Sequence, residues 1–180
     1  MQIGYIWCMA ESPTGTPPAT YIAAIQDSLG DARTLDAVIA VLRIAAREWT
    51  SADGVTVVLR EGDLCYYAEE NAIGPLWKSR RFPMKDCVSG WAMLYRQRVV
   101  IPDIYQDPRV PLSAYEPTFV KALAIVPIRL ERPMGAIGAY WRVVHSASAH
   151  ELSALETLAR LAGDAFERVA NAGEIISRAS

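Results

Sequence analysis

Two strand–turn–strand patterns, enclosed by helical patterns, leave few folds open to this chain. In each pair, β-branched and apolar residues run toward a short polar turn and then return, as in an antiparallel hairpin. The first pair covers residues 55–60 and 64–68, and the second covers residues 122–129 and 135–144. We therefore expect an antiparallel sheet at the centre of the fold.

Helical patterns stand before, between and after these hairpins. Apolar residues recur at helical spacing over residues 35–49, shorter helices are predicted over 88–97 and 114–120, and a strand over 98–102 lies between the two. The segments 69–86 and 103–112 contain turn residues and are predicted as loops, the first with one short helical turn. The order α-ββ-α-β-α-ββ-α predicts an α/β (α+β) fold, with helices on the faces of one sheet. The glycines at 135 and 138 indicate a close backbone approach or a bulge.

The pattern from Glu151 onward is a long helix with two apolar stripes. One stripe occupies the a and d positions of a heptad frame, and a second stripe lies beside it. Either one stripe packs on the domain while the other meets a partner helix, or both form a single wide face toward the core. The sequence leaves both interpretations open. The a and d residues are Leu152, Leu155, Ala159, Ala162, Phe166, Val169 and Ile176, and the second stripe is Leu158, Leu161 and Ala165.

Length and charge restrict the class of protein. With 180 residues, of which 52% are hydrophobic, the chain can bury the core of one domain. The net charge is −2, and the basic residues are scattered, so a nucleic-acid partner is not expected.

The cysteines and the N-terminal residues predict a cytoplasmic protein. Cys8, Cys65 and Cys87 are odd in number and far apart, which argues against a disulfide framework and favours a reducing compartment. The apolar start is short and has no basic leader, and no apolar run is long enough to span a bilayer.

Three blocks of the sequence carry a resemblance to a known family. They are CVSGWAMLYRQRVVIPDIYQDPRVP (87–111), YEPTFVKALAIVPIR (115–129) and PMGAIGAYW (133–141). In this order and spacing they resemble a GAF domain, especially those beside PAS and histidine-kinase modules in bacterial sensor proteins. The resemblance extends over roughly residues 30–170.

The resemblance implies about six antiparallel strands, with a pocket on one face roofed by short helices and loops. It also implies that the first and last helices pack together on the other face and form a homodimer. We therefore divide the chain into a flexible lead-in (1–30), a GAF sensor core (31–150) and a C-terminal signalling and dimerisation helix (151–180). The implied function is a sensory module, not an enzyme, that relays a small-molecule or redox signal to an output such as a histidine kinase.

The candidate ligand-binding residues lie near the pocket that the resemblance implies. Cys87 precedes a predicted helix, whose dipole lowers a thiol pKa, although Asp86 opposes this and a buried thiol is more often inert packing. Asp103, Asp107 and Arg109 could orient a polar ligand, or could cap and pair within their own loop. The aromatic candidates, which are also ordinary core residues, are Trp77, Phe82, Trp91, Tyr105, Tyr115 and Phe119.

The ligand or cofactor is not identified by any motif. The patterns that mark cyclic-nucleotide binding or bilin attachment in this family have no counterpart here, and His145 and His150 have no Glu or Cys at metal-ligand spacing. Two alternatives stay open: a ligandless dimerisation or adaptor module whose pocket is filled by Trp91 and Tyr115, and a reductase of free methionine sulfoxide. The reductase needs several pocket cysteines, and only Cys87 is placed for it. A bilin photoreceptor attached at Cys8 is a weaker option.

Overall fold

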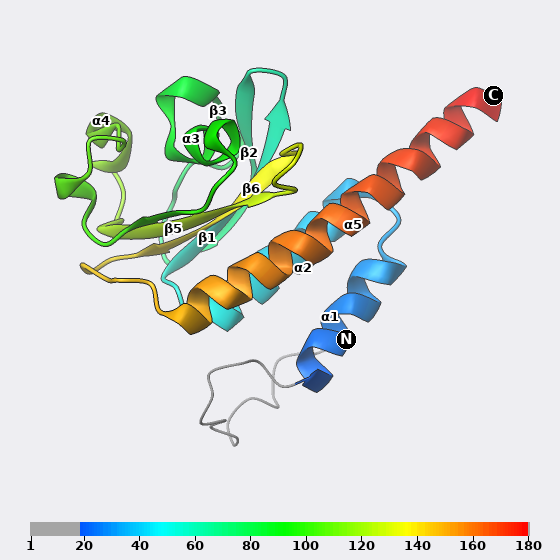
Figure 1. Ribbon diagram of the computed structural model, residues 1–180, viewed down its shortest axis with the longest axis horizontal. Coiled ribbons are helices and arrows are strands. Elements are labelled where there is room, and N and C mark those ends of the chain that lie inside the picture. The colour runs from blue at the N-terminus through cyan, green and yellow to red at the C-terminus, as the bar shows by residue number, and fades with distance from the viewer. Residues whose placement is uncertain (1–18, 180) are drawn as a thin grey trace.

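A six-stranded antiparallel sheet forms the centre of the fold, as Figure 1 shows, in the order β3-β2-β1-β6-β5-β4. The computed structural model describes the backbone of residues 19–179 and the side chains of residues 19–172. The sheet confirms the predicted antiparallel core and its six strands. The strands are β1 (Gly54–Glu61), β2 (Leu64–Ala72), β3 (Arg81–Pro83), β4 (Val99–Ile101), β5 (Ala122–Ile128) and β6 (Gly135–Trp141).

Helices cover both faces of the sheet, as predicted (Figure 1). α2 and α5 pack on one face and α1 lies against these two helices, while α3 packs on the opposite face over β5 and β6. No helix in the part of the chain that the structure describes is both long and apolar enough to cross a membrane. The helices are α1 (Ala19–Asp31), α2 (Leu35–Thr50), α3 (Val88–Tyr95), α4 (Leu112–Tyr115) and α5 (Ala149–Ala179), with short 3-10 turns η1 (Met84–Asp86) and η2 (Ile104–Gln106).

The sheet separates two hydrophobic cores. Every residue of β5 and β6 is buried, and successive residues alternate between the two cores. In β6, Ala139 and Trp141 face the core shared with α5, whereas Tyr140 faces the core shared with α3. Because both faces are covered, these antiparallel strands are apolar throughout instead of half polar.

The two apolar stripes of α5 both belong to the core of this chain. Leu155, Ala159, Ala162 and Phe166 are buried with α2 and the sheet, together with the second stripe, and Leu152 and Val169 pack at the edge of the same core. The prediction of a free dimerisation seam is therefore corrected in favour of one wide core-facing stripe. The physical reason is that α5 has the sheet, α2 and α1 as neighbours. The side chain of Ile176 lies outside the described residues.

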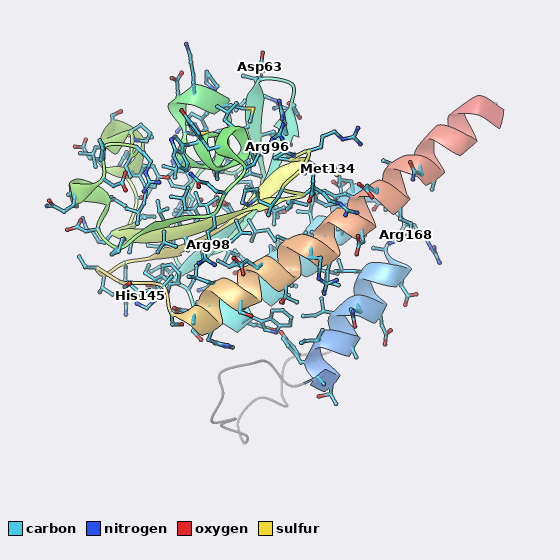
Figure 2. All side chains as sticks on the ribbon, viewed as in Figure 1. Asp63, Arg96, Arg98, Met134, His145 and Arg168 are labelled. Carbon is cyan, nitrogen blue, oxygen red and sulfur yellow. The ribbon has the colours of Figure 1, made fainter. Side chains whose placement is uncertain are left out.

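α1 corrects the predicted lead-in, because residues 19–30 of the 1–30 segment are helical. Ile25 and Leu29 bury this helix against the core of α2 and α5. The guanidinium of Arg168 on α5, labelled in Figure 2, donates to the Leu29 carbonyl over 2.5 Å and to the Ala32 carbonyl over 2.9 Å. These bonds satisfy carbonyls that the end of α1 leaves without helical partners. Residues 1–18, which include Cys8, lie outside the described residues.

Smaller differences concern the bounds of other elements. β2 continues to Ala72, and β3 lies in the segment 69–86 predicted as a loop. β3 pairs with β2 and has only three residues, too few for an alternating pattern to be visible. The helix predicted over 114–120 is the shorter α4, and β6 ends at Trp141 instead of 144.

The two glycines of β6 both lie at close approaches, as predicted. A side chain at Gly135 would collide with the backbone of Val58, and one at Gly138 would collide with the ring of Tyr140. The bulge of the sheet lies elsewhere, between Val57 and Val58 where β1 pairs with β2. Gly138 therefore leaves room for Tyr140 to fold back over its own strand.

Candidate functional site

A small cavity lies between the sheet and the loops around α3 and α4. Its volume is about 10 Å³, which is room for about one water molecule. We call this cavity and its lining the aromatic chamber. The lining residues are Tyr67, Trp77, Phe82, Asp86, Cys87, Pro111, Ala114 and Tyr115.

Trp77 packs against three tyrosines at the chamber. Its ring meets Tyr115 edge-on at a centroid distance of 4.8 Å, and it meets Tyr67 and Tyr140 in the same manner at 5.5 Å each. Edge-to-face geometry of this kind is favourable beyond the area that it buries. The indole Nε1 also donates to the Ala114 carbonyl over 3.0 Å, which joins the β2–β3 connection to α4.

The carboxylate of Glu70 holds the loop that carries Trp77. It accepts hydrogen bonds from the backbone N–H groups of Leu76, Trp77 and Lys78, at 3.1, 2.9 and 2.9 Å. Hydrogen bonds to an ionised acceptor are stronger than those between neutral groups. The position of the tryptophan is thus fixed by a charged group at the end of β2.

A buried polar layer lies beneath the aromatic rings. Thr56 Oγ1 and Tyr140 Oη are 3.0 Å apart, and Tyr67 Oη and Ser89 Oγ are 3.2 Å apart. Burial raises the pKa of Tyr67, Tyr115 and Tyr140 above the usual value of a phenol. These hydroxyls are therefore neutral at physiological pH and remain available as hydrogen-bond donors.

One thiol lines the chamber and a second lies behind it. Cys65 on β2 is a neighbour of Cys87 in the same core, and Cys87 is the N-cap of α3, where its sulfur accepts from Gly90 N–H over 3.4 Å. The neighbouring thiol of Cys65 lowers the pKa of Cys87, whereas Cys87 and burial raise the pKa of Cys65. The predicted helix N-terminal position of Cys87 is confirmed. As expected, Cys87 is the cysteine that lines the pocket, and Cys65 lies behind it in the same hydrophobic core.

Only part of the predicted site lines the chamber. Trp77, Phe82, Cys87 and Tyr115 do so. Phe119 is only partly buried and packs over Gly54 at the start of β1.

The guanidinium of Arg109 pairs with its own loop. It binds both carboxylate oxygens of Asp107 over 2.9 and 2.6 Å, and this contact lowers the pKa of Asp107. It also lies 4.7 Å from the ring centre of Trp91, which stacks on Tyr95 outside the chamber. Asp107 and Arg109 therefore pair within their own loop, which is the structural alternative to binding a polar ligand.

Asp103 and Tyr105 also lie outside the chamber. The Asp103 carboxylate accepts from the backbone N–H of Tyr105 over 3.0 Å and caps η2. Tyr105 is exposed, and its hydroxyl accepts from Lys121 Nζ over 2.8 Å. These contacts belong to the loop itself.

The residues missed at this site belong to the strands beneath it. Cys65 and Tyr67 share one face of β2 by the period of two, so the alternation in residues 64–68 could have placed them together. No comparable pattern marks Thr56, Ser89 and Tyr140. A polar residue in the core can be identified only once its hydrogen-bond partner is known, and the sequence does not show that partner. Within the described residues, no three metal-binding side chains come together.

The comparisons with known proteins agree with this architecture. The family described as GAF domain matches residues 32–167 of the chain. No curated protein matches the sequence.

Solved structures match the fold at low sequence identity, so their likeness concerns the fold alone. A free methionine-R-sulfoxide reductase of Neisseria meningitidis, in complex with its substrate, has 20% identity and a TM-score of 0.70, covering 84% of this chain and 89% of that one. The GAF domain of an Acinetobacter phosphoenolpyruvate-protein phosphotransferase has 11% identity and a TM-score of 0.74, covering 86% and 96%. The chromophore-binding domain of a bacteriophytochrome of R. palustris has 18% identity and a TM-score of 0.73, covering 86% and 61%.

Proposed function

The chain belongs to the GAF domain family, and we propose that it is a sensory module in which a change at the aromatic chamber is relayed through the sheet to α5. GAF domains are generally sensory or regulatory, and one neighbour of this fold is the chromophore-binding domain of a bacteriophytochrome. The proposal concerns what this chain senses and how the change travels.

The observation that carries the proposal is that β6 contacts both the chamber and α5. Tyr140 packs against Trp77 on one face, and its neighbours Ala139 and Trp141 belong to the core of α5 on the other. Close-packed interiors transmit small displacements, because they have no free volume to absorb them. A stimulus that moves the aromatic rings therefore shifts the position at which α5 packs on the sheet. A ligand can bias the output only by the difference between its affinities for the shifted and the unshifted packing.

The input is a small molecule or a redox change. A small molecule larger than water enters only if Trp77 or Tyr115 moves, because the cavity is about 10 Å³. A redox change needs no such opening, since the two thiols are already neighbours in one core. The size of the chamber thus favours the redox input.

The relay is tested with Trp77→Ala, which removes the ring that packs against Tyr140 of β6. We expect faster amide hydrogen exchange in residues 149–172 of α5 as well as around α3. Adding indole, which fits the space of the deleted side chain, should reverse both changes.

The control for this experiment is Trp91→Ala, because Trp91 lies outside the chamber. It should leave the exchange of α5 unchanged. If Trp77→Ala alters exchange near α3 and leaves α5 as in the wild type, the two faces of the sheet are not coupled and the proposal fails.

The output belongs to the proposal as well. We expect a homodimer that passes the change to a signalling partner such as a histidine kinase. Because the apolar stripes of α5 pack within the chain over the residues whose side chains are described, we expect the contact between two copies to use other surfaces. Sedimentation at several protein concentrations checks the dimer, and a single monomeric species at all of them would contradict it.

Two other functions are each favoured by one observation. The filled chamber favours a ligandless adaptor, which predicts no thermal stabilisation by any metabolite in a screen. The paired thiols and the Neisseria neighbour favour a reductase of free methionine sulfoxide, which predicts turnover of that compound with a thiol reductant. The small cavity opposes the reductase, because the substrate is far larger than one water molecule.

A further inference from the structure

Cys65 and Cys87 come together from separate parts of the chain. β3 pairs Phe82 with Cys65, and η1 then carries the chain directly to Cys87 at the start of α3. Gly90 packs so closely on Met84 that no side chain fits there, which holds the start of α3 against η1. The proximity of the two thiols is therefore a consequence of the connection between β2 and α3.

Three groups surround the sulfur of Cys87. The backbone N–H of Gly90 donates to it over 3.4 Å, and the thiol of Cys65 and the hydroxyl of Tyr67 are neighbours that lower its pKa. Donors aimed at one sulfur favour its thiolate form, which is the reactive form of cysteine. Cys65 has no such set of donors and remains the protonated partner. The pair therefore has a nucleophile and a neighbouring thiol that can react with it second.

Exposure and cavity size select the oxidant. Cys87 lines the chamber and is 8% exposed, whereas Cys65 is 0% exposed, so an entering molecule reaches Cys87 first. The cavity of about 10 Å³ holds about one water molecule. Hydrogen peroxide is only slightly larger than water, whereas organic hydroperoxides and disulfides such as oxidised glutathione are much larger.

We propose that Cys65 and Cys87 are a dithiol site that hydrogen peroxide oxidises to a disulfide. The Cys87 thiolate attacks one peroxide oxygen, the O–O bond breaks, and the departing hydroxide takes up a proton to become water. Cys87 is now a sulfenic acid. The Cys65 sulfur attacks it, an S–S bond forms, the S–O bond breaks, and the hydroxyl leaves with the proton of Cys65 as a second water. Two electrons pass from the thiols to the peroxide.

The disulfide would move the start of α3. Bonded sulfurs lie about 2.0 Å apart, closer than hydrogen-bonded thiols, so the N-terminus of α3 must approach β2. Cys87 and the ring of Trp77 line the same cavity, so this approach compresses the chamber. The site thus supplies the redox input of the proposed sensory function, on which this step of the inference rests.

The test uses the full chain with Cys8→Ser, so that only the two thiols of interest remain. The reduced protein is treated with equimolar hydrogen peroxide, then alkylated under denaturing conditions and weighed by mass spectrometry. We expect the loss of two hydrogens, no alkylation, and a linked peptide that contains residues 65 and 87. Dithiothreitol should restore both thiols.

Single substitutions in the same background separate the two roles. Cys65→Ser should leave Cys87 to stop at the sulfenic or sulfinic acid, with no crosslink. Cys87→Ser should slow peroxide consumption by about an order of magnitude, because the remaining thiol is the protonated one. Two free thiols after peroxide treatment, or reaction at Cys65 first, would overturn the proposal.

The outcomes separate this site from the relay. If the disulfide forms and hydrogen exchange in α5 stays unchanged, the dithiol chemistry stands and the relay fails. If no disulfide forms while Trp77→Ala still alters α5, the relay stands and the dithiol site fails.

Discussion

Four hydroxyl groups in the core behind the chamber are satisfied by one another. Thr56, Ser89, Tyr67 and Tyr140 are all buried, and each has a hydroxyl partner within the set. A buried hydroxyl without a partner is costly, whereas removing both partners of a pair is close to neutral. The pairing of Thr56 with Tyr140 therefore gives a clear prediction.

Thr56→Val should destabilise the fold by about 1–3 kcal/mol, because the Tyr140 hydroxyl loses a partner. The double variant with Tyr140→Phe should cost less than the sum of the two single variants. Urea denaturation measures both, and Ser113→Ala at an exposed position is the control. Additive costs would mean that the two hydroxyls do not act as a pair.

The sequence shows which face of a strand a residue occupies, but not what packs on that face. Alternation in β2 places Cys65 beside Tyr67 on one face. That Cys87 meets this face depends on the docking of α3 by way of the three-residue strand β3, which leaves no periodic pattern. The aromatic candidates could be listed from the sequence, but only packing separates Trp77 in the chamber from Trp91 outside it.

At the scale of the element, α5 is a core helix of this domain. Arg129, which follows β5, donates to Asp164 and Glu167 over 2.8 and 2.6 Å, and Arg98 pairs with Glu156 over 2.7 Å. Exposed ion pairs contribute little stability by themselves, so they fix where the helix lies more than whether it packs. The buried leucines supply the stability.

Leu155→Ala should destabilise the fold by about 2–5 kcal/mol, because Leu155 is fully buried beside α2 and the sheet. The loss should be the same at low and high protein concentration, since the side chain packs within one chain. Urea denaturation at two concentrations checks this. A loss that shrinks as the concentration rises would indicate a seam between two copies.

The sequence predicts the helix α5, but it does not predict α1, which packs beside α5. A heptad frame gives the same apolar spacing whether the facing element is a partner helix or the domain itself. The neighbour that the sequence did not show is α1, which follows a Pro- and Thr-rich segment and buries only Ile25 and Leu29. Two buried residues are too few to make a periodic signal.

At the scale of the whole molecule, the two cores share one sheet and should unfold together. A chain that ends at residue 172 keeps every buried residue of α5 that the structure describes, whereas one that ends at residue 157 loses Leu158, Ala162 and Phe166. We expect cooperative urea unfolding from the first and none from the second. Circular dichroism measures both, and a folded shorter chain would show that the α3 side is stable alone.

The order of strands in the sheet also fixes when the fold can be completed during synthesis. β1 pairs with β2 on one edge. Its other edge stays unpaired until β6, which begins only at Gly135, has been synthesised. At ribosomal speeds of roughly 5–20 residues per second, the strand remains open for several seconds. Such an edge recruits other strands, so nascent chains of this protein should depend on chaperones until Gly135–Trp141 has left the ribosome.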